Sequence, residues 1–216
     1  MFKYGIIAAQ LEEAIPTIKD LYLKRLSDTI YLNEDKGIIL MISGVSMLNA
    51  YSSTVSLLST FNLDYVVNIG VVAGRGELSV GDVVTVDRAY NGDMDLTGFG
   101  HSLYSVPGIG DYLESIYETE ALDLEIPAVD CFSVSYFSDS SIAIGDYVVD
   151  MEYYGILLAC NQWRVPCLAI KCVSDTLESE DSIEEYNSNL DSSSHKLVES
   201  IRYFINSKKP TLKLRR

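Results

Sequence analysis

Carboxylate side chains follow short apolar runs at three places in the chain. Glu13 comes soon after YGIIAA, Asp150 and Glu152 stand in YVVDME, and Asp175 follows CLAIKCVS. If these runs are strands of one α/β sheet, their carboxyl ends form the rim where such sheets bind ligands. Few basic residues stand nearby to neutralise the carboxylates. The rim therefore suits proton transfer and the recognition of sugar hydroxyls better than phosphate, and we expect Asp150 among the substrate-binding residues.

The apolar pattern predicts the elements that would hold these carboxylates. Continuous apolar runs predict buried strands at residues 4–9, 37–43, 65–70, 82–87, 127–135, 147–150 and 167–173. Helical periodicity predicts helices at residues 11–23, 48–60, 152–163 and 183–204. Strands that are apolar throughout must be covered on both faces, and their interleaving with helices predicts an α/β fold.

Two glycine-rich segments interrupt this pattern. Gly70, Gly74 and Gly76 come after the run at residues 65–70 and predict a turn. Residues 91–111 contain several glycines and one proline, and this segment is long for a plain connection. We therefore expect it to be a functional loop or part of an interface.

Composition and charge limit the classes of partner. The chain has 216 residues, of which 48% are hydrophobic, enough for one generous globular domain. It has 31 acidic residues against 16 basic ones, a formal net charge of −15. Nucleic acid binding needs clustered Lys and Arg, so nucleic acid is not an expected partner. The one basic cluster is the tail at residues 208–216, which we expect to be a solvated terminus.

Membrane insertion, secretion and metal binding are not expected either. No apolar run reaches the roughly 20 residues of a membrane span, and carboxylates follow the first apolar run at once, unlike in a secretion signal. Cys131, Cys160, Cys167 and Cys172 lack the spacing of metal ligands. We expect them to be reduced thiols in the core of a cytoplasmic protein.

Five motifs occur in an order that resembles one enzyme superfamily. They are GIIAAQLEEA, VVNIG with the later VGDVV, DMDLTGFG, VVDMEYYG and CVSDT. The chain resembles the nucleoside phosphorylase/hydrolase superfamily, and is most similar to the 5′-methylthioadenosine/S-adenosylhomocysteine nucleosidases, over residues 4–204. The resemblance implies a single three-layer domain at residues 1–207, with a central mixed sheet flanked by helices. It also implies hydrolysis of the N-glycosidic bond of a 5′-substituted adenosine, to adenine and a thioribose, by a cytoplasmic homodimer without a cofactor.

The resemblance gives each carboxylate a role. Asp175, oriented by Ser174, would hydrogen-bond or protonate N7 of adenine, which requires a raised pKa. Glu152 would accept hydrogen bonds from the ribose hydroxyls, with Met151 packed on the sugar. Glu13 would hold and deprotonate the attacking water. These roles fit a glycosidic bond that breaks through an oxocarbenium-like state, with the purine leaving as a neutral base.

The resemblance also implies contacts from aromatic and loop residues. Phe137 would stack on the purine. The segment with Phe99, His101, Leu103 and Pro107 resembles the loop that covers the 5′-pocket of the neighbouring subunit. Leu103 and Pro107 would therefore contact a nucleoside bound by the partner.

Some positions depart from the nucleosidase pattern. Val71 stands where the nucleosidases have a Ser that helps to position the water, and Lys171 stands where they have an Arg; we expect both among the substrate-binding residues. Tyr153 and Tyr154 replace the usual small residues after the Met-Glu pair. These changes leave the water site and the exact substrate open.

Three alternatives stay open. A phosphorylase of the same fold would need cations around its phosphate, and only Lys171, Arg75 and Arg88 are available. A non-catalytic nucleoside-binding or storage protein, a kind known among plant members of the superfamily, would need no catalytic acid. Each carboxylate alone could also be structural, as a first-turn acid of a helix or as a cap.

Overall fold

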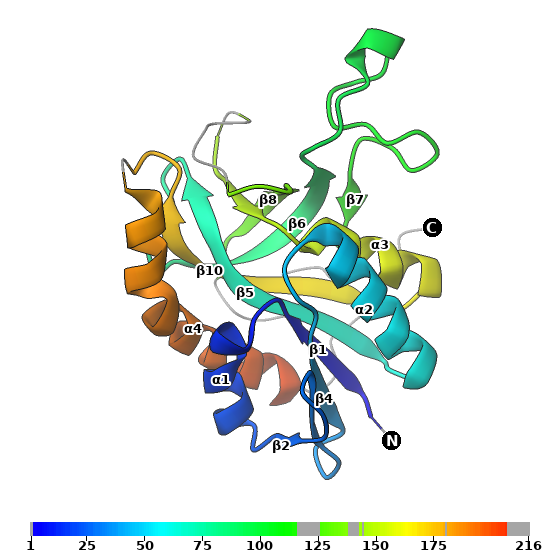
Figure 1. Ribbon diagram of the computed structural model, residues 1–216, viewed down its shortest axis with the longest axis vertical. Coiled ribbons are helices and arrows are strands. Elements are labelled where there is room, and N and C mark those ends of the chain that lie inside the picture. Colours follow the sequence, from blue (N-terminus) through cyan, green and yellow to red (C-terminus); the bar gives the residue numbers. More distant parts are fainter. Residues whose placement is uncertain (1, 116–125, 138–142, 144, 180, 207–216) are drawn as a thin grey trace.

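The computed structural model describes residues 2–115, 126–137, 143, 145–179 and 181–206, which form a sheet between two layers of helices (Figure 1). The strands are β1 (Tyr4–Ala8), β2 (Lys24–Arg25), β3 (Ile30–Asn33), β4 (Ile38–Ile42), β5 (Tyr65–Arg75), β6 (Val83–Asn91), β7 (Leu113–Glu114), β8 (Ala128–Ser133), β9 (Tyr147–Asp150) and β10 (Cys167–Thr176). The helices are α1 (Leu11–Asp20), α2 (Met47–Thr60), α3 (Tyr153–Trp163) and α4 (Ser182–Asn206), with one 3₁₀ turn, η1 (Thr97–Phe99).

The sheet is mixed, as predicted. β1 pairs in parallel with β4 and β5, and β5 pairs in parallel with β10. β9 runs antiparallel to β5, and β6 runs antiparallel to β10. Because β8 also pairs with β6 and with β9, the strands β5, β10, β6, β8 and β9 close into a ring. In this ring Ala73 of β5 is in register with Val149 of β9 on one side and Asp175 of β10 on the other.

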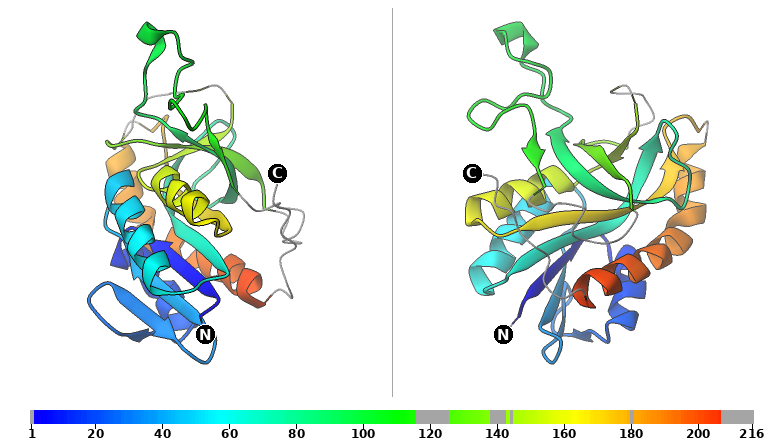
Figure 2. Two further views of the ribbon diagram at one scale, coloured as in Figure 1. Left: turned by 90° about the vertical axis from the view of Figure 1, so that its right-hand side faces the viewer. Right: turned by 180° about the vertical axis from the view of Figure 1, so that it is seen from behind.

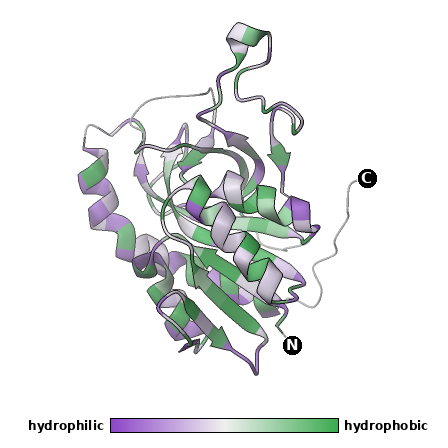
Figure 3. Ribbon diagram, turned by 45° about the vertical axis from the view of Figure 1, so that its right-hand side comes forward, coloured by the Kyte–Doolittle hydropathy of each residue, from purple (hydrophilic) through white to green (hydrophobic). Residues whose placement is uncertain are grey.

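Helices cover both faces of the sheet (Figure 2). α2 and α3 lie together on one face, and α1 and α4 lie on the other. Successive residues of β1 enter different cores: Ile7 packs in the core that includes α2 and α3, and Ile6 in the core that includes α1 and α4. Figure 3 shows strands that are largely hydrophobic and helices that carry both kinds of residue. The predicted three-layer arrangement is therefore confirmed.

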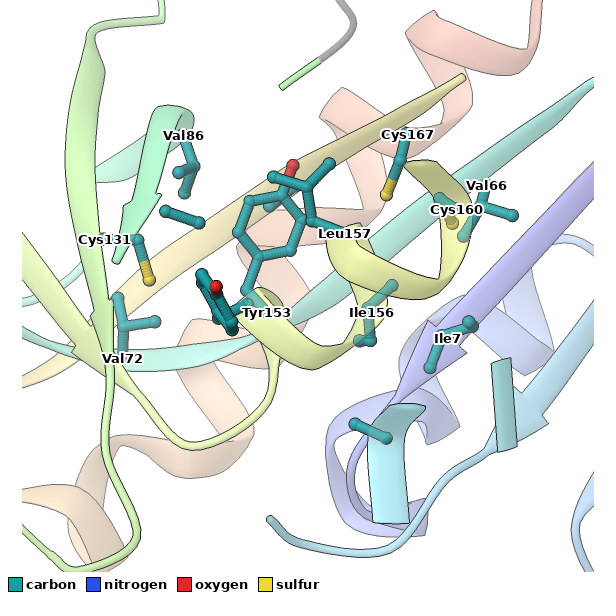
Figure 4. Packing of buried hydrophobic residues seen from close by; sticks show 14 of the residues in the cluster. Ile7, Val66, Val72, Val86, Cys131, Tyr153, Ile156, Leu157, Cys160 and Cys167 are labelled. Atoms are coloured by element: carbon teal, nitrogen blue, oxygen red, sulfur yellow. The ribbon is translucent and has the colours of Figure 1, made fainter. Parts of the chain in front are cut away.

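The core beside α3 contains most of the cysteines. Cys131, Cys160 and Cys167 pack there with the ring of Tyr153 (Figure 4). All four cysteines of the chain are free and buried, as predicted. The described core is therefore held by packing without disulfides.

Three strands extend beyond the apolar runs that predict them: β5 to Arg75, β6 to Asn91 and β10 to Thr176. The predicted glycine turn after residue 70 is therefore wrong. Gly70 and Gly74 lie inside β5, and only Gly76, with a φ of 84°, takes a turn conformation. The strand continues because residues 71–75 have pairing partners on β9 and β10.

Several smaller features were not predicted. β2, β3 and β7 are short or polar strands without a continuous apolar run.

The segment at residues 92–112 projects from the body of the molecule (Figure 1). The basic tail at residues 208–216 lies outside the described residues. None of the described helices combines the length and the apolar character needed to cross a membrane.

Candidate active site

A cavity of about 400 Å³ opens at the carboxyl ends of β1, β9 and β10. The middle of β5 and the first turns of α1 and α4 also line it, together with the aromatic rings of Tyr136, Phe137 and Tyr186. Four carboxylates of the described residues line this cavity: Glu13, Asp150, Glu152 and Asp175. Their surroundings differ, and these differences decide what each can do.

Asp150, the last residue of β9, is enclosed by hydrogen-bond donors. Its Oδ2 accepts from Lys171 Nζ at 2.8 Å and from the N–H of Tyr153 at 3.0 Å. Its Oδ1 accepts from the Ser133 hydroxyl at 2.6 Å and from the N–H of Glu152 at 3.3 Å. Burial opposes its ionisation, but Lys171 and these hydrogen bonds outweigh burial and lower the pKa of Asp150. Asp150 and Lys171 therefore form a buried ion pair.

Glu152 stands beside this ion pair, at the N-cap of α3. Its Oε1 accepts from the N–H of Ser46 at 2.9 Å. Burial, and then the negative charge of Asp150, raise the pKa of Glu152 from 4.5 to about 7, against the opposing charge of Lys171. Glu152 can therefore gain or lose a proton near neutral pH.

Glu13, in the first turn of α1, is held between the helix and the sheet. Its Oε2 accepts from the N–H of Gln10 at 3.0 Å, and its Oε1 accepts from the N–H of Val71 at 3.2 Å. The carboxylate fits closely because position 70 is a glycine: a Cβ on Gly70 would lie 3.2 Å from Oε1. Burial raises the pKa of Glu13, and the charge of Lys171 opposes this rise. Glu13 is therefore a fixed, buried carboxyl group suited to act as a base.

Asp175 is the one of these four carboxylates with a fully buried oxygen that has no hydrogen-bond partner among the described residues. Oδ1 accepts from the Ser174 hydroxyl at 2.6 Å, whereas the buried Oδ2 has no hydrogen-bond partner among the described residues. The register with β5 is irregular between Val173 and Asp175, an irregularity that re-aims side chains. Burial raises the pKa of Asp175; the hydrogen bond from Ser174 opposes the rise and Glu185 adds to it. A buried carboxyl of this kind is suited to donate a proton to a ligand.

Cations are missing from the described lining of the cavity, which contains no Lys, Arg or His. The basic residues available to a phosphate are each bound to a carboxylate, in the pairs Lys171–Asp150, Arg75–Glu178 and Arg88–Asp130. The lining therefore favours neutral or cationic ligands over anions.

Known proteins resemble this chain in sequence. No family model matches it. The 5′-methylthioadenosine/S-adenosylhomocysteine nucleosidase of Marinomonas sp. (strain MWYL1) is 32% identical over 174 residues, which cover 71% of this chain and 75% of that protein. The nucleosidase of the same name from Listeria innocua is 30% identical over 205 residues, 82% of this chain and 87% of that protein. The chain belongs to this nucleosidase family.

Solved structures agree in fold with this membership. The 5′-methylthioadenosine/S-adenosylhomocysteine nucleosidase from Neisseria meningitidis, in complex with methylthio-immucillin-A, matches with a TM-score of 0.85. The match covers 96% of this chain and 100% of that chain, at 23% identity. The predicted nucleoside phosphorylase-like fold is therefore confirmed.

Most of the residues that the sequence singled out meet in the cavity of this nucleosidase-family chain. They are Glu13, Val71, Phe137, Asp150, Met151, Glu152, Ser174 and Asp175. Lys171 does not line the cavity, contrary to the expectation of a direct contact, because its 2% exposed side chain is bound to Asp150. Leu103 and Pro107 lie on the projecting segment and do not line this cavity. Their contact with a nucleoside held by a partner stays a prediction.

Tyr153 and Tyr154 do not line the cavity. Both side chains are buried, and the Tyr153 hydroxyl lies 2.6 Å from Ser115 Oγ in the core. Val71 contributes its backbone N–H to Glu13, a contact that does not depend on its side chain. Tyr153 and Tyr154 therefore lie outside the lining, and the contact that Val71 makes with Glu13 is through its backbone.

Sequence reasoning missed one side of the lining. This side includes Gln10, Tyr136, Ile183, Tyr186 and Asn187. Gln10 stands inside the first motif, next to the carboxylates that drew attention. Ile183, Tyr186 and Asn187 are spaced i, i+3 and i+4 on α4, so helical periodicity assigns them to one face. The sequence carries no signal that this face meets a cavity.

Proposed function

We propose that this cavity binds a 5′-substituted adenosine, such as 5′-methylthioadenosine, and hydrolyses its N-glycosidic bond to adenine and a thioribose. The observation that carries the proposal is Asp175, a buried carboxyl with a raised pKa and one oxygen without a described partner. The cavity volume of about 400 Å³ lies in the range of small-molecule sites. Membership of the nucleosidase family supports the same reaction.

Asp175 is the proposed acid. Burial raises the pKa of this carboxyl and so favours its protonated form, from which Oδ2 can deliver the proton to N7 of adenine. The base then leaves as a neutral molecule, which lowers the barrier to breaking the bond. Ser174 holds Oδ1 at 2.6 Å and so fixes the direction of Oδ2. Phe137, also in the lining, is the proposed stacking partner of the purine.

In this proposal Glu152 binds the ribose and Glu13 activates the water. Glu152 accepts hydrogen bonds from the ribose hydroxyls, and Met151 packs on the ring. An ionised Glu152 also stabilises the positive charge that develops on the ribosyl group. Glu13 is fixed by two backbone N–H groups and takes a proton from the water that attacks C1′.

Water is the proposed nucleophile instead of phosphate. A phosphate dianion in the cavity would meet four carboxylates and no cation of the described lining. Lys171, Arg75 and Arg88 are each bound to a carboxylate. A phosphorylase would need these charges free for its substrate.

Incubation with 5′-methylthioadenosine in phosphate-free buffer tests the proposal. We expect free adenine and thioribose, separated by chromatography, at a rate that does not respond to added phosphate. A rate that requires phosphate, with thioribose 1-phosphate as product, would indicate a phosphorylase. Binding of the nucleoside without release of adenine would indicate a storage protein.

We propose further that the chain acts as a homodimer in the cytoplasm, with the segment at residues 92–112 reaching the partner's cavity. The projection of this segment and the exposure of its apolar residues support the dimer: Phe99 is 83% and Leu103 47% exposed. Light scattering at micromolar concentration should give twice the chain mass of 24.0 kDa. A fully active monomer would contradict the dimer.

A further inference from the structure

A hydrogen bond in the cavity lining joins two residues that the proposed mechanism leaves unused. Nε2 of Gln10, just before α1, donates to the hydroxyl oxygen of Tyr186 in α4 at 3.1 Å. The ring of Tyr186 meets the ring of Phe137 edge-on, with centroids 6.1 Å apart. Gln10, Tyr186 and Phe137 therefore form one wall, which we call the Tyr186 wall.

The first turns of α4 hold Tyr186 in a fixed place. Oε2 of Glu185 accepts from the N–H of Thr176 at 2.8 Å, and Nδ2 of Asn189 donates to the carbonyl of Ser174 at 3.1 Å. Both contacts are to β10, on either side of Asp175. A polar group that is already held in place can discriminate between ligands, because binding costs it little conformational entropy.

The hydroxyl of Tyr186 keeps a proton that a ligand can accept. Its oxygen receives the hydrogen bond from Gln10, and a phenol can accept and donate at the same time. Burial, and then the charge of Glu13, raise the pKa of Tyr186, and Asp175 and Glu152 add to the rise. The side chain is therefore a neutral phenol at physiological pH.

The shape of a nucleoside directs its 5′-carbon to the Tyr186 wall. In a β-nucleoside the base and C5′ project from one face of the ribose, and the 2′- and 3′-hydroxyls project from the other. In the proposed orientation, with the hydroxyls at Glu152 and the base stacked on Phe137, C5′ lies on the same face of the ribose as the base. Tyr186 contacts the ring of Phe137, and we take C5′ to lie within its reach.

We propose that Gln10 and Tyr186 select the 5′-substituent of the nucleoside and favour a neutral group that accepts a hydrogen bond, strongly for a hydroxyl and weakly for a thioether sulfur, over a substituent that accepts none. This inference rests on the proposed function, from which it takes the orientation of the nucleoside. Tyr186 donates to the substituent, and Gln10 holds the Tyr186 hydroxyl in position. An anionic substituent is disfavoured, because the described lining has four carboxylates and no Lys, Arg or His.

Adenosine and 5′-deoxyadenosine test this selection, since they differ only in the 5′-hydroxyl. We expect kcat/KM of the parent to favour adenosine about tenfold, the equivalent of one hydrogen bond of about 1.4 kcal/mol. Tyr186→Phe keeps the ring and removes the donor, so the preference should disappear. Gln10→Leu should reduce the preference in part. Tyr203→Phe, at a partly exposed position near the other end of α4, is the control and should keep the parent ratio.

Titration calorimetry with the same nucleosides separates selection from catalysis. If the parent cleaves nucleosides and Tyr186→Phe keeps the parent preference, the selection by Tyr186 is refuted and the proposed function stands. If the parent cleaves no nucleoside, the proposed function fails. The affinities for adenosine and 5′-deoxyadenosine then decide whether Tyr186 selects the 5′-substituent. Tighter binding of adenosine that Tyr186→Phe abolishes supports the selection, and equal binding of both nucleosides by the parent overturns it.

Discussion

Two buried aspartates, on the strands that flank β5, lie in opposite surroundings. Asp150, at the end of β9, accepts from Lys171, Ser133 and two backbone N–H groups. Asp175, near the end of β10, accepts from Ser174 and has one oxygen without a described partner. Only 5% of Asp150 and 1% of Asp175 are exposed, so burial does not separate them.

The two aspartates differ in the hydrogen-bond donors and charges around them. Burial acts to raise the pKa of both groups, but at Asp150 the charge of Lys171 and the hydrogen bonds reverse this effect. At Asp175 no cation among the described residues opposes burial, and its pKa is raised. The end of β9 therefore holds an ionised carboxylate beside Glu152, while the end of β10 holds a carboxyl whose pKa is raised. The same residue type is ion-paired in one place and is the proposed acid in the other.

Asp175→Asn is expected to have the largest effect on activity. Asparagine can still hydrogen-bond to the base but cannot deliver a proton, so cleavage of 5′-methylthioadenosine should fall roughly 10² to 10⁴ fold. Binding of a non-cleavable adenosine analogue, measured by calorimetry, should change little. Stability to urea should not fall, because the substitution removes a buried carboxyl without a full set of partners. A variant that cleaves at the parent rate would make Asp175 a structural residue like Asp150.

Breaking the Lys171–Asp150 pair is expected to lower the free energy of unfolding. Lys171→Met leaves Asp150 as a buried charge without its cation, and should lower the free energy of unfolding by about 3–5 kcal/mol. Asp150→Asn leaves Lys171 as a buried charge without its carboxylate and should lower the free energy of unfolding by a similar amount. The double variant should lose much less than the sum, since no isolated charge remains.

Urea denaturation of the four proteins measures this coupling, and Lys171→Arg, which keeps the charge, is the matched control. Additive losses would mean that the two side chains do not stabilise one another. In that case the contrast between the ends of β9 and β10 would have another cause.

A smaller effect is expected from Glu152, and it depends on pH. Because the pKa of Glu152 is raised from 4.5 to about 7, the folded chain holds a proton that the unfolded chain releases. The stability of the parent therefore falls as pH rises through this window, by up to about 3 kcal/mol from this group. Glu152→Gln does not titrate, so its stability relative to the parent should rise between pH 4.5 and pH 8.

Urea denaturation of Glu152→Gln and the parent at both ends of that window measures the difference. Glu12→Gln, at an exposed position in the first turn of α1, is the control variant measured in parallel. If the difference in free energy of unfolding between Glu152→Gln and the parent stays constant with pH, Glu152 does not hold this proton, and another carboxylate of the cavity does.

The sequence predicted the carboxylates of the site better than their partners. Glu13, Glu152 and Asp175 could be found because each follows an apolar run, and the ends of such strands meet at one rim. The pairing of Lys171 with Asp150 could not be found. A lysine inside an apolar strand looks the same whether or not a carboxylate faces it, and this partner is 21 residues away on another strand of the ring.

The parts of the fold that escaped prediction depend on long-range contacts. The glycines at positions 70, 74 and 76 predict a turn over residues 71–75, although Val71 and Val72 favour a strand. These residues are strand because β9 and β10 pair with them. The contact between Gln10 and Tyr186 joins residues 176 positions apart, which helical periodicity cannot reveal. The helices and central strands were predictable because burial repeats locally along them.

The most direct test of the proton transfer from Asp175 removes its acceptor. In 7-deaza-methylthioadenosine a carbon replaces N7, so this position cannot take up a proton. Release of the base in a single turnover, followed by chromatography, should be roughly 10² to 10⁴ fold slower than from 5′-methylthioadenosine with the parent. Asp175→Asn should slow the 7-deaza nucleoside no further, because the proton transfer is already lost. Equal rates for both nucleosides with the parent would contradict Asp175 as the acid, and so would a further loss of the same size in the variant.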